Sequence, residues 1–248
     1  MKQRIATLII ALGLLTPVLS MATAHAEAST STPRGAAATG TSTADSKRLT
    51  AIKTRGDAEL GRRVDTLARL LITINSATKL SDSSKQALSE QVGNENVALA
   101  ALRVKLAAET TVADAANDIK TMITEYRVYA LIVPKVQIIR AADDEQAAEA
   151  KLLALQAKLT TRINNASAAG KDVTALQTKL DDMAANLTQA QLISAGVETS
   201  VLPLQPTDYD NDHTILSGYR DNLKTAKIAA QAAFTDAKAI VAGLKKLG

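Results

Sequence analysis

A short acidic segment near the C-terminal end contains the residues whose types and spacing come nearest to a recognised chemistry. Asp208, Asp210 and Asp212 place carboxylates at alternate positions, as in the first half of an EF-hand calcium loop. The pattern then fails, because His213 stands where the loop needs a glycine and Tyr219 stands where it needs a bidentate glutamate. We therefore predict no metal site and treat Asp208, Asp210 and Asp212 as an incomplete calcium motif. The alternative is a turn in which Asp212 caps the following helix.

Catalysis is not indicated by any residue pattern in the chain. Catalysis by histidine would have to centre on His213, with Asp208 or Asp210 as its partner, because the other histidine, His25, falls in the N-terminal leader. No nucleophile-elbow, zinc-protease or phosphate-loop pattern accompanies it. Cysteine is absent, which excludes disulfides and thiolate chemistry. We predict that the protein is not an enzyme, and we expect no cofactor.

A binding site is indicated instead in the most apolar run outside the leader, from Tyr126 to Ile139. Tyr126 falls on the helix face expected to be buried, whereas Tyr129 lies beside that face, where its ring can be buried and its hydroxyl hydrated. Pro134 is expected to kink the helix. Tyr126, Tyr129 and Pro134 therefore define a candidate groove for a partner or ligand. The alternative is ordinary core packing at a helix joint.

The composition favours helices that pack closely on one another. Hydrophobic residues make up 46% of the chain, yet aromatic residues make up only 2% and tryptophan is absent. The apolar residues are therefore mainly alanine, leucine, isoleucine and valine, which suit close helix–helix contacts. We predict an all-α fold.

Apolar residues recur at three- and four-residue spacing over five segments, which predicts five long helices. Their expected bounds are about 46–77, 82–109, 111–165, 173–201 and 213–247. Thr111 and Asp114 resemble a capping box at the start of the third helix, which is expected to continue through the kink at Pro134. The middle of the second helix, Gly93 to Asn96, is polar for a buried face. Gly56 lies inside the first helix, where either a neighbouring helix passes closely or the first turns fray.

Short turns between these helices predict an elongated antiparallel helical bundle. Residues 46–133 are expected to form one helical unit and residues 134–248 a second, each of three helices, with the kinked third helix shared between them. The alternative is a single bundle in which the third helix bends more sharply and its halves lie side by side. Heptad spacing in the last two helices, from Val173 to Val201 and from Leu216 to Leu247, predicts coiled-coil seams.

The N-terminal residues have the features of an export signal. A basic start and an apolar stretch, Ile5 to Leu15, precede Ala24-His25-Ala26, which fits a cleavage site. We predict that residues 1–26 are a signal peptide and that residues 27–45, rich in alanine, serine, threonine and glycine, are a disordered tether. The protein is therefore expected to be exported, to the cell surface or the extracellular space, with no membrane span after leader cleavage.

The charge pattern argues against a nucleic-acid partner. Loss of the leader removes Lys2 and Arg4, which leaves 27 basic residues against 25 acidic ones. Both signs alternate along every predicted helix, whereas phosphate backbones are bound by a concentrated basic face. We expect no nucleic-acid binding.

Three segments together resemble a family of secreted all-helical proteins from small-genome bacteria. They are YRVYALIVPK from Tyr126, GKDVTALQTKLDDM from Gly170 and VLPLQPTDYDND from Val201. The likeness covers most of the chain after the leader. That family is uncharacterised and has no assigned activity, so the resemblance implies an exported bacterial helical protein and transfers no functional residue.

These features predict an exported, coiled-coil-like structural or protein-interaction protein that is not catalytic and that acts at the cell envelope or outside the cell. We expect a protein partner or self-association through the heptad faces, and contact with the envelope. The alternative is a soluble extracytoplasmic binding or chaperone-like helical module, which takes a peptide or lipid ligand in a groove near Pro134.

Overall fold

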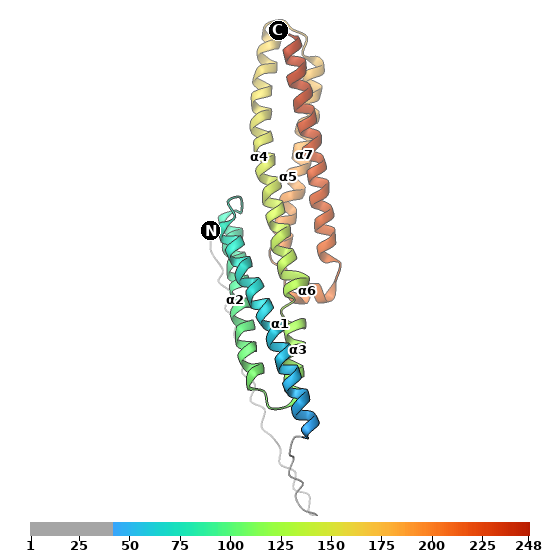
Figure 1. Ribbon diagram of the computed structural model, residues 1–248. Helices are drawn as coiled ribbons and strands as arrows, with labels where there is room; N and C mark the ends of the chain where they lie inside the picture. The colour runs from blue at the N-terminus through green and yellow to red at the C-terminus, as the bar shows by residue number, and fades with distance from the viewer. Residues whose placement is uncertain (1–41) are drawn as a thin grey trace, which may run out of the picture. The chain divides into compact units, whose positions relative to one another are not determined.

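The computed structural model describes residues 42–248, and every regular element in this range is a helix. The predicted signal peptide, 1–26, and residues 27–41 of the predicted tether lie outside the described residues. In chain order (Figure 1) the helices are α1 (Thr43–Ser76), α2 (Asp82–Ala108), α3 (Val112–Thr124), the π-helical turn η1 (Val128–Ile132), α4 (Val133–Ala168), α5 (Thr174–Val201), α6 (Pro206–Asn211) and α7 (Ile215–Lys246). The predicted all-α fold is confirmed, with α1, α2, α4, α5 and α7 as its long helices.

The first helix begins earlier than the sequence pattern predicts. Ser42 caps α1, because its hydroxyl accepts a hydrogen bond from the Asp45 backbone N–H at 3.1 Å and donates one to the Asp45 carboxylate at 2.8 Å. These bonds satisfy a donor that the first turn of a helix leaves free. As a correction, residues 43–45 belong to α1 and not to the predicted tether of residues 27–45. The predicted cap at Thr111 is confirmed, with the Asp114 N–H donating to its hydroxyl at 3.1 Å.

The third predicted helix is interrupted before Pro134. Helix α3 ends at Thr124, and a turn at Glu125–Arg127 leads into η1 and α4. Pro134 then follows directly on η1 near the start of α4, and the π-helical turn before it takes the place of regular α-helical hydrogen bonds at the proline. The interruption therefore lies at Glu125–Arg127 and not at Pro134, which corrects its expected position.

Arg127 adopts the left-handed backbone conformation at this turn, with φ of 43°. Such a conformation costs a non-glycine residue about 1–2 kcal/mol. A contact with α6 opposes this cost, because the Arg127 Nε donates to Asp210 Oδ1 at 2.7 Å and Nη2 lies 2.6 Å from the same oxygen. The guanidinium also lies 5.8 Å from the centre of the Tyr209 ring. The turn is thus held by residues far away in the sequence.

The helices enclose two hydrophobic cores. The first joins α1, α2, α3 and η1 to the start of α4, the end of α5 and the start of α7, and includes Leu60, Leu88, Leu131 and Val201. It therefore continues past residue 134, where the sequence suggested a boundary between two units. The second core belongs to α4, α5 and α7, which lie side by side in Figure 1. A layer of alanines, which includes Ala190 and Ala230, lies between α5 and α7 in the same bundle.

The heptad seams of α5 and α7 pack inside the chain. Leu180 and Leu187 of α5 and Ala237 and Ile240 of α7 are at most 5% exposed and belong to the second core. The apolar positions of both seams thus meet each other and α4. Their regular spacing is explained by intramolecular packing.

Gly56 marks a close approach of α1 to its neighbours. A methyl group added at Gly56 would overlap the Cδ1 atom of Ile119 on α3 and the Cδ2 atom of Leu106 on α2. Gly56 itself is buried. Of the two explanations that the sequence left open for this glycine, the structure supports the close passage of a neighbouring helix.

We expect Gly56→Ala to lower the free energy of unfolding by about 1–3 kcal/mol, because the added methyl group overpacks the contact with α2 and α3. Gly93→Ala is the matched control, since Gly93 is also helical and nothing lies within 4 Å of an added methyl group. That change should raise the free energy of unfolding by about 0.5–1 kcal/mol through helix propensity. Urea denaturation followed by circular dichroism measures both values, and stabilisation by Gly56→Ala would contradict the close approach.

Candidate functional site

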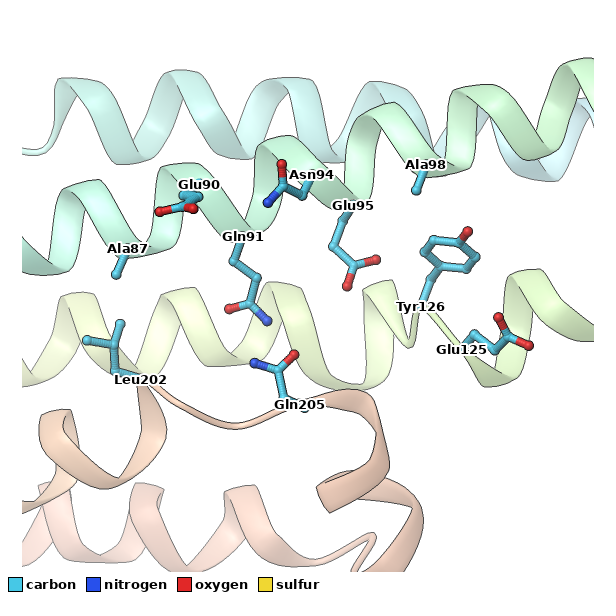
Figure 2. Close-up of a pocket in the computed structure, with 10 residues that line it drawn as sticks. All are labelled: Ala87, Glu90, Gln91, Asn94, Glu95, Ala98, Glu125, Tyr126, Leu202 and Gln205. Carbon is cyan, nitrogen blue, oxygen red and sulfur yellow. The ribbon is translucent and has the colours of Figure 1, made fainter. Parts of the chain in front are cut away.

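A cavity of about 580 Å³ opens beside the turn at Glu125–Arg127. One wall is α2, another is the end of α3, and the segment after α5 closes the third side (Figure 2). The residues that line it are Ala87, Glu90, Gln91, Asn94, Glu95, Ala98, Glu125, Tyr126, Leu202 and Gln205. Three carboxylates, three amides and one aromatic ring thus face a single space, and none of the lining side chains is basic. We call it the Glu95 cavity.

Glu95 is the most perturbed group of the cavity. Burial raises the pKa of its carboxyl to about 7, and the positive charge of Lys135 opposes this increase. Its Oε2 atom is buried and has no hydrogen-bond partner among the described residues. Figure 2 shows the carboxylate extending from α2 toward the region of Tyr126. An unpartnered carboxylate oxygen away from solvent favours the protonated form, in agreement with the raised pKa.

The Tyr126 ring provides the aromatic wall of the Glu95 cavity. Burial raises the pKa of its hydroxyl, and the negative charges of Glu95 and Glu125 raise it further. The hydroxyl is therefore neutral at physiological pH. Glu90 and Glu125 are solvent-exposed. The cavity combines three carboxyl groups with one aromatic face, an arrangement that favours cations when the carboxyl groups are ionised.

Lys135 lies behind this cavity and is 1% exposed. Its Nζ donates to Gln91 Oε1 at 2.6 Å and to the Leu204 carbonyl at 2.8 Å. Burial lowers the pKa of its ammonium to about 8, while the charges of Asp208 and Glu95 oppose that decrease. Lys135 therefore connects α4 to α2 and to the segment that follows α5.

The structure separates the three residues of the predicted groove. Tyr126 lines the Glu95 cavity, whereas Tyr129 contacts α1, with its ring 5.1 Å from the guanidinium of Arg63 and its hydroxyl 3.4 Å from that of Thr66. Pro134 is half-buried in the first turn of α4 and does not line the cavity. Only Tyr126 of the three is thus brought to a space that a ligand can enter.

The incomplete calcium motif does not form a common site. Asp208 accepts a hydrogen bond from the backbone at the start of α6 at 2.7 Å, Asp210 pairs with Arg127, and Asp212 accepts from the Thr214 N–H at 2.8 Å. The helical turn of α6 directs each carboxylate to its own partner. Within residues 42–248, no group of three or more histidine, cysteine or acidic side chains is arranged to hold a metal ion. Asp208 and Asp212 thus accept hydrogen bonds from backbone N–H groups, and Asp210 is the ion-pair partner of Arg127.

The sequence analysis did not select two residues of the site, Glu95 and Lys135, although each has an unusual sequence context. Glu95 belongs to the polar stretch Gly93–Asn96, which interrupts a face expected to be apolar. Lys135 is the only charged residue between Val128 and Ile139, within the most apolar run outside the leader. A charged residue inside such a run is expected to be paired or hydrogen-bonded.

Comparison of the chain with protein-family models, with curated proteins and with solved structures gave no match. Among the described helices, none combines the length and apolar character needed to cross a lipid bilayer. The function is therefore argued below from the geometry of this chain alone.

A second buried carboxyl contributes to the electrostatics of the fold. Asp143 on α4 is 5% exposed, and its Oδ2 atom lacks a hydrogen-bond partner among the described residues. Burial, together with the charges of Glu198 and Asp144, raises its pKa to about 6. Like Glu95, Asp143 binds its proton more tightly in the folded state than in the unfolded one.

We expect the free energy of unfolding to fall as the pH rises from about 4.5 to 8. A carboxyl whose pKa is raised by folding stabilises the folded state fully at a pH below its pKa in the unfolded chain. This stabilisation is lost as the pH rises through the folded-state pKa, which is about 6 for Asp143 and about 7 for Glu95. Titration of Lys135 changes the free energy of unfolding only above about pH 8, because its lowered pKa is about 8. For Glu95 the loss should be about 1–2 kcal/mol after allowance for partial solvent exposure.

Thermal unfolding between pH 4.5 and 8 measures this slope in the parent chain and in two variants. Glu95→Gln should flatten the slope near pH 7, and Asp143→Asn should flatten it near pH 6. A residual slope is expected from Glu145 and Glu149, whose pKa values are also raised by burial. An unchanged slope near pH 7 in Glu95→Gln would show that Glu95 titrates normally.

Proposed function

We propose that the protein is a non-catalytic interaction protein that acts outside the cytoplasm and receives a basic group of its partner in the Glu95 cavity. The observation that carries this proposal is the cavity beside Tyr126, where Glu95, two further glutamates and an aromatic ring line one space. An ammonium or guanidinium group matches all of these features, through charge-assisted hydrogen bonds to the carboxylates and a cation–π contact with the ring.

The cavity is large enough to accommodate a basic side chain or a small polyamine. Its volume of about 580 Å³ falls within the range of small-molecule sites, which is about 300–1,000 Å³. The lysine or arginine side chain of a partner protein would occupy part of this space. The amides of Gln91, Asn94 and Gln205 supply further hydrogen-bonding groups around the bound cation.

The packing of α5 and α7 also bears on the mode of interaction. The heptad seams that suggested self-association are buried against α4 within the chain, and Leu187 and Ile240 are 1% and 0% exposed. We therefore assign partner recognition to the Glu95 cavity and not to a coiled coil formed with a second chain. Action outside the cytoplasm is supported by the leader pattern of residues 1–26.

Isothermal titration of the chain expected after leader removal, residues 27–248, tests this function with tetralysine and spermidine as probes. Both should bind at pH 8, where Glu95 is ionised, and more weakly at pH 6, where it is mostly protonated. Glu95→Gln should weaken binding at pH 8 about tenfold or more, because a charge-assisted hydrogen bond contributes about 1.5–3 kcal/mol. Asp221→Asn is the control, since it removes one exposed carboxylate of α7 outside the cavity.

Two results would contradict the proposed function. The first is equal affinity of tetralysine for the parent chain and Glu95→Gln, which would separate binding from the cavity. The second is binding of tetraglutamate as strong as that of tetralysine, which would show that the protein does not select a positively charged ligand. Cosedimentation with envelopes of the source cell then tests the location, and free tetralysine should release the protein from the pellet.

A further inference from the structure

A second hollow lies between α1 and α3 and shares no lining residue with the Glu95 cavity. It has a volume of about 510 Å³, and its floor is apolar. The floor residues are Ala51, Ile52, Gly56, Ala116, Ile119, Met122 and Ile123. We call this hollow the α1–α3 groove. Its apolar floor is reachable from solvent, because Ile123 is 47% exposed.

Three arginines of α1, at positions 48, 55 and 63, border the α1–α3 groove. Arg63 is paired with Glu59, which also accepts from Arg62. No ion pair joins Arg48 or Arg55 to a carboxylate among residues 42–248. Both side chains are exposed and lie seven residues apart on one face of α1. They place two uncompensated positive charges at the edge of an apolar surface.

We propose that the α1–α3 groove binds a long-chain fatty acid, with its carboxylate on Arg48 and Arg55 and its acyl chain along the apolar floor. Arginine forms bidentate hydrogen bonds with carboxylates, so the two guanidinium groups match this head group in charge and geometry. The apolar floor matches the acyl chain, whose transfer from water contributes about 0.8 kcal/mol for each buried CH₂ group.

The α1–α3 groove has a volume of about 510 Å³, which falls within the range of small-molecule sites, about 300–1,000 Å³. A single acyl chain is a ligand of this size class. Ala51, Gly56 and Ala116 line the groove with small residues, and at Gly56 α1 and α3 lie close together. Gly56 contributes directly, because its missing side chain lets Ile119 lie against α1.

Displacement of a dansyl-labelled fatty acid tests this ligand class on the chain of residues 27–248. Laurate should displace the label with one-to-one stoichiometry below its micelle-forming concentration. Dodecyltrimethylammonium and dodecyl maltoside have the same tail with a cationic and a neutral head group, and we expect each to compete at least tenfold more weakly. Equal competition by the three surfactants would overturn the assignment of an anionic head group.

Variants at exposed positions locate the site without disturbing the core. Arg48→Glu combined with Arg55→Glu should weaken laurate binding at least tenfold, whereas Arg69→Glu, a single substitution of the same kind on α1 outside the groove, should leave it unchanged. Ala51→Trp should block the groove, and Ala58→Trp is its control on an exposed face of α1. Circular dichroism and thermal unfolding confirm that each variant folds.

Other occupants of the α1–α3 groove would give different results. Tighter displacement by an acidic amphipathic peptide than by laurate would reassign the groove to a protein partner. A concentration-dependent dimer that Ala51→Trp dissociates would reassign it to a second copy of the chain. Laurate binding that persists in the double arginine variant and in Ala51→Trp would place the site elsewhere. Glu95→Gln should not change laurate binding, so this test is independent of the proposed cation site.

Discussion

The buried ammonium of Lys135 is the interaction on which the arrangement of this chain most depends. Removing a charged group from water is unfavourable unless hydrogen bonds replace those to solvent. Two acceptors do so here, Gln91 on α2 and the Leu204 carbonyl after α5. The same charge lies near Glu95 and opposes the increase in the pKa of that carboxyl. One side chain therefore links three segments of the chain and sets the electrostatics of the cavity between them.

The turn at Glu125–Arg127 determines how α4 enters this arrangement. A continuous helix would carry α3 directly into α4, whereas the left-handed residue Arg127 and the wide turn of η1 offset the two helices. The π-helical turn also precedes Pro134, so the proline ring meets a locally wider helix and not a regular one. The ion pair with Asp210 on α6 secures the turn. The irregular backbone lies beside the Glu95 cavity, as strained segments often do at binding sites.

Local periodicity was sufficient to predict the long helices, but it could not predict the break. The approximate bounds of α1, α2, α5 and α7 follow from apolar spacing, and the start of α3 follows from its capping residue Thr111, which acts within a few residues. The left-handed turn at Arg127 has no glycine, asparagine or proline to mark it, and Asp210 lies 83 residues further along the chain. The cavity was predictable in part, because Tyr126 and the polar stretch around Glu95 were visible in the sequence. Its closure by Gln205 depends on tertiary packing, which periodicity does not encode.

Helix α3 is a wall of both hollows. Ile119, Met122 and Ile123 face the α1–α3 groove, and Glu125 and Tyr126, just past the end of the helix, face the Glu95 cavity. The helix is short, and a cap at one end and a turn at the other separate it from its neighbours. An occupant that displaces α3 on one side therefore alters the space on the other. Such coupling is reciprocal in free energy, so each ligand would change the affinity for the other by the same factor.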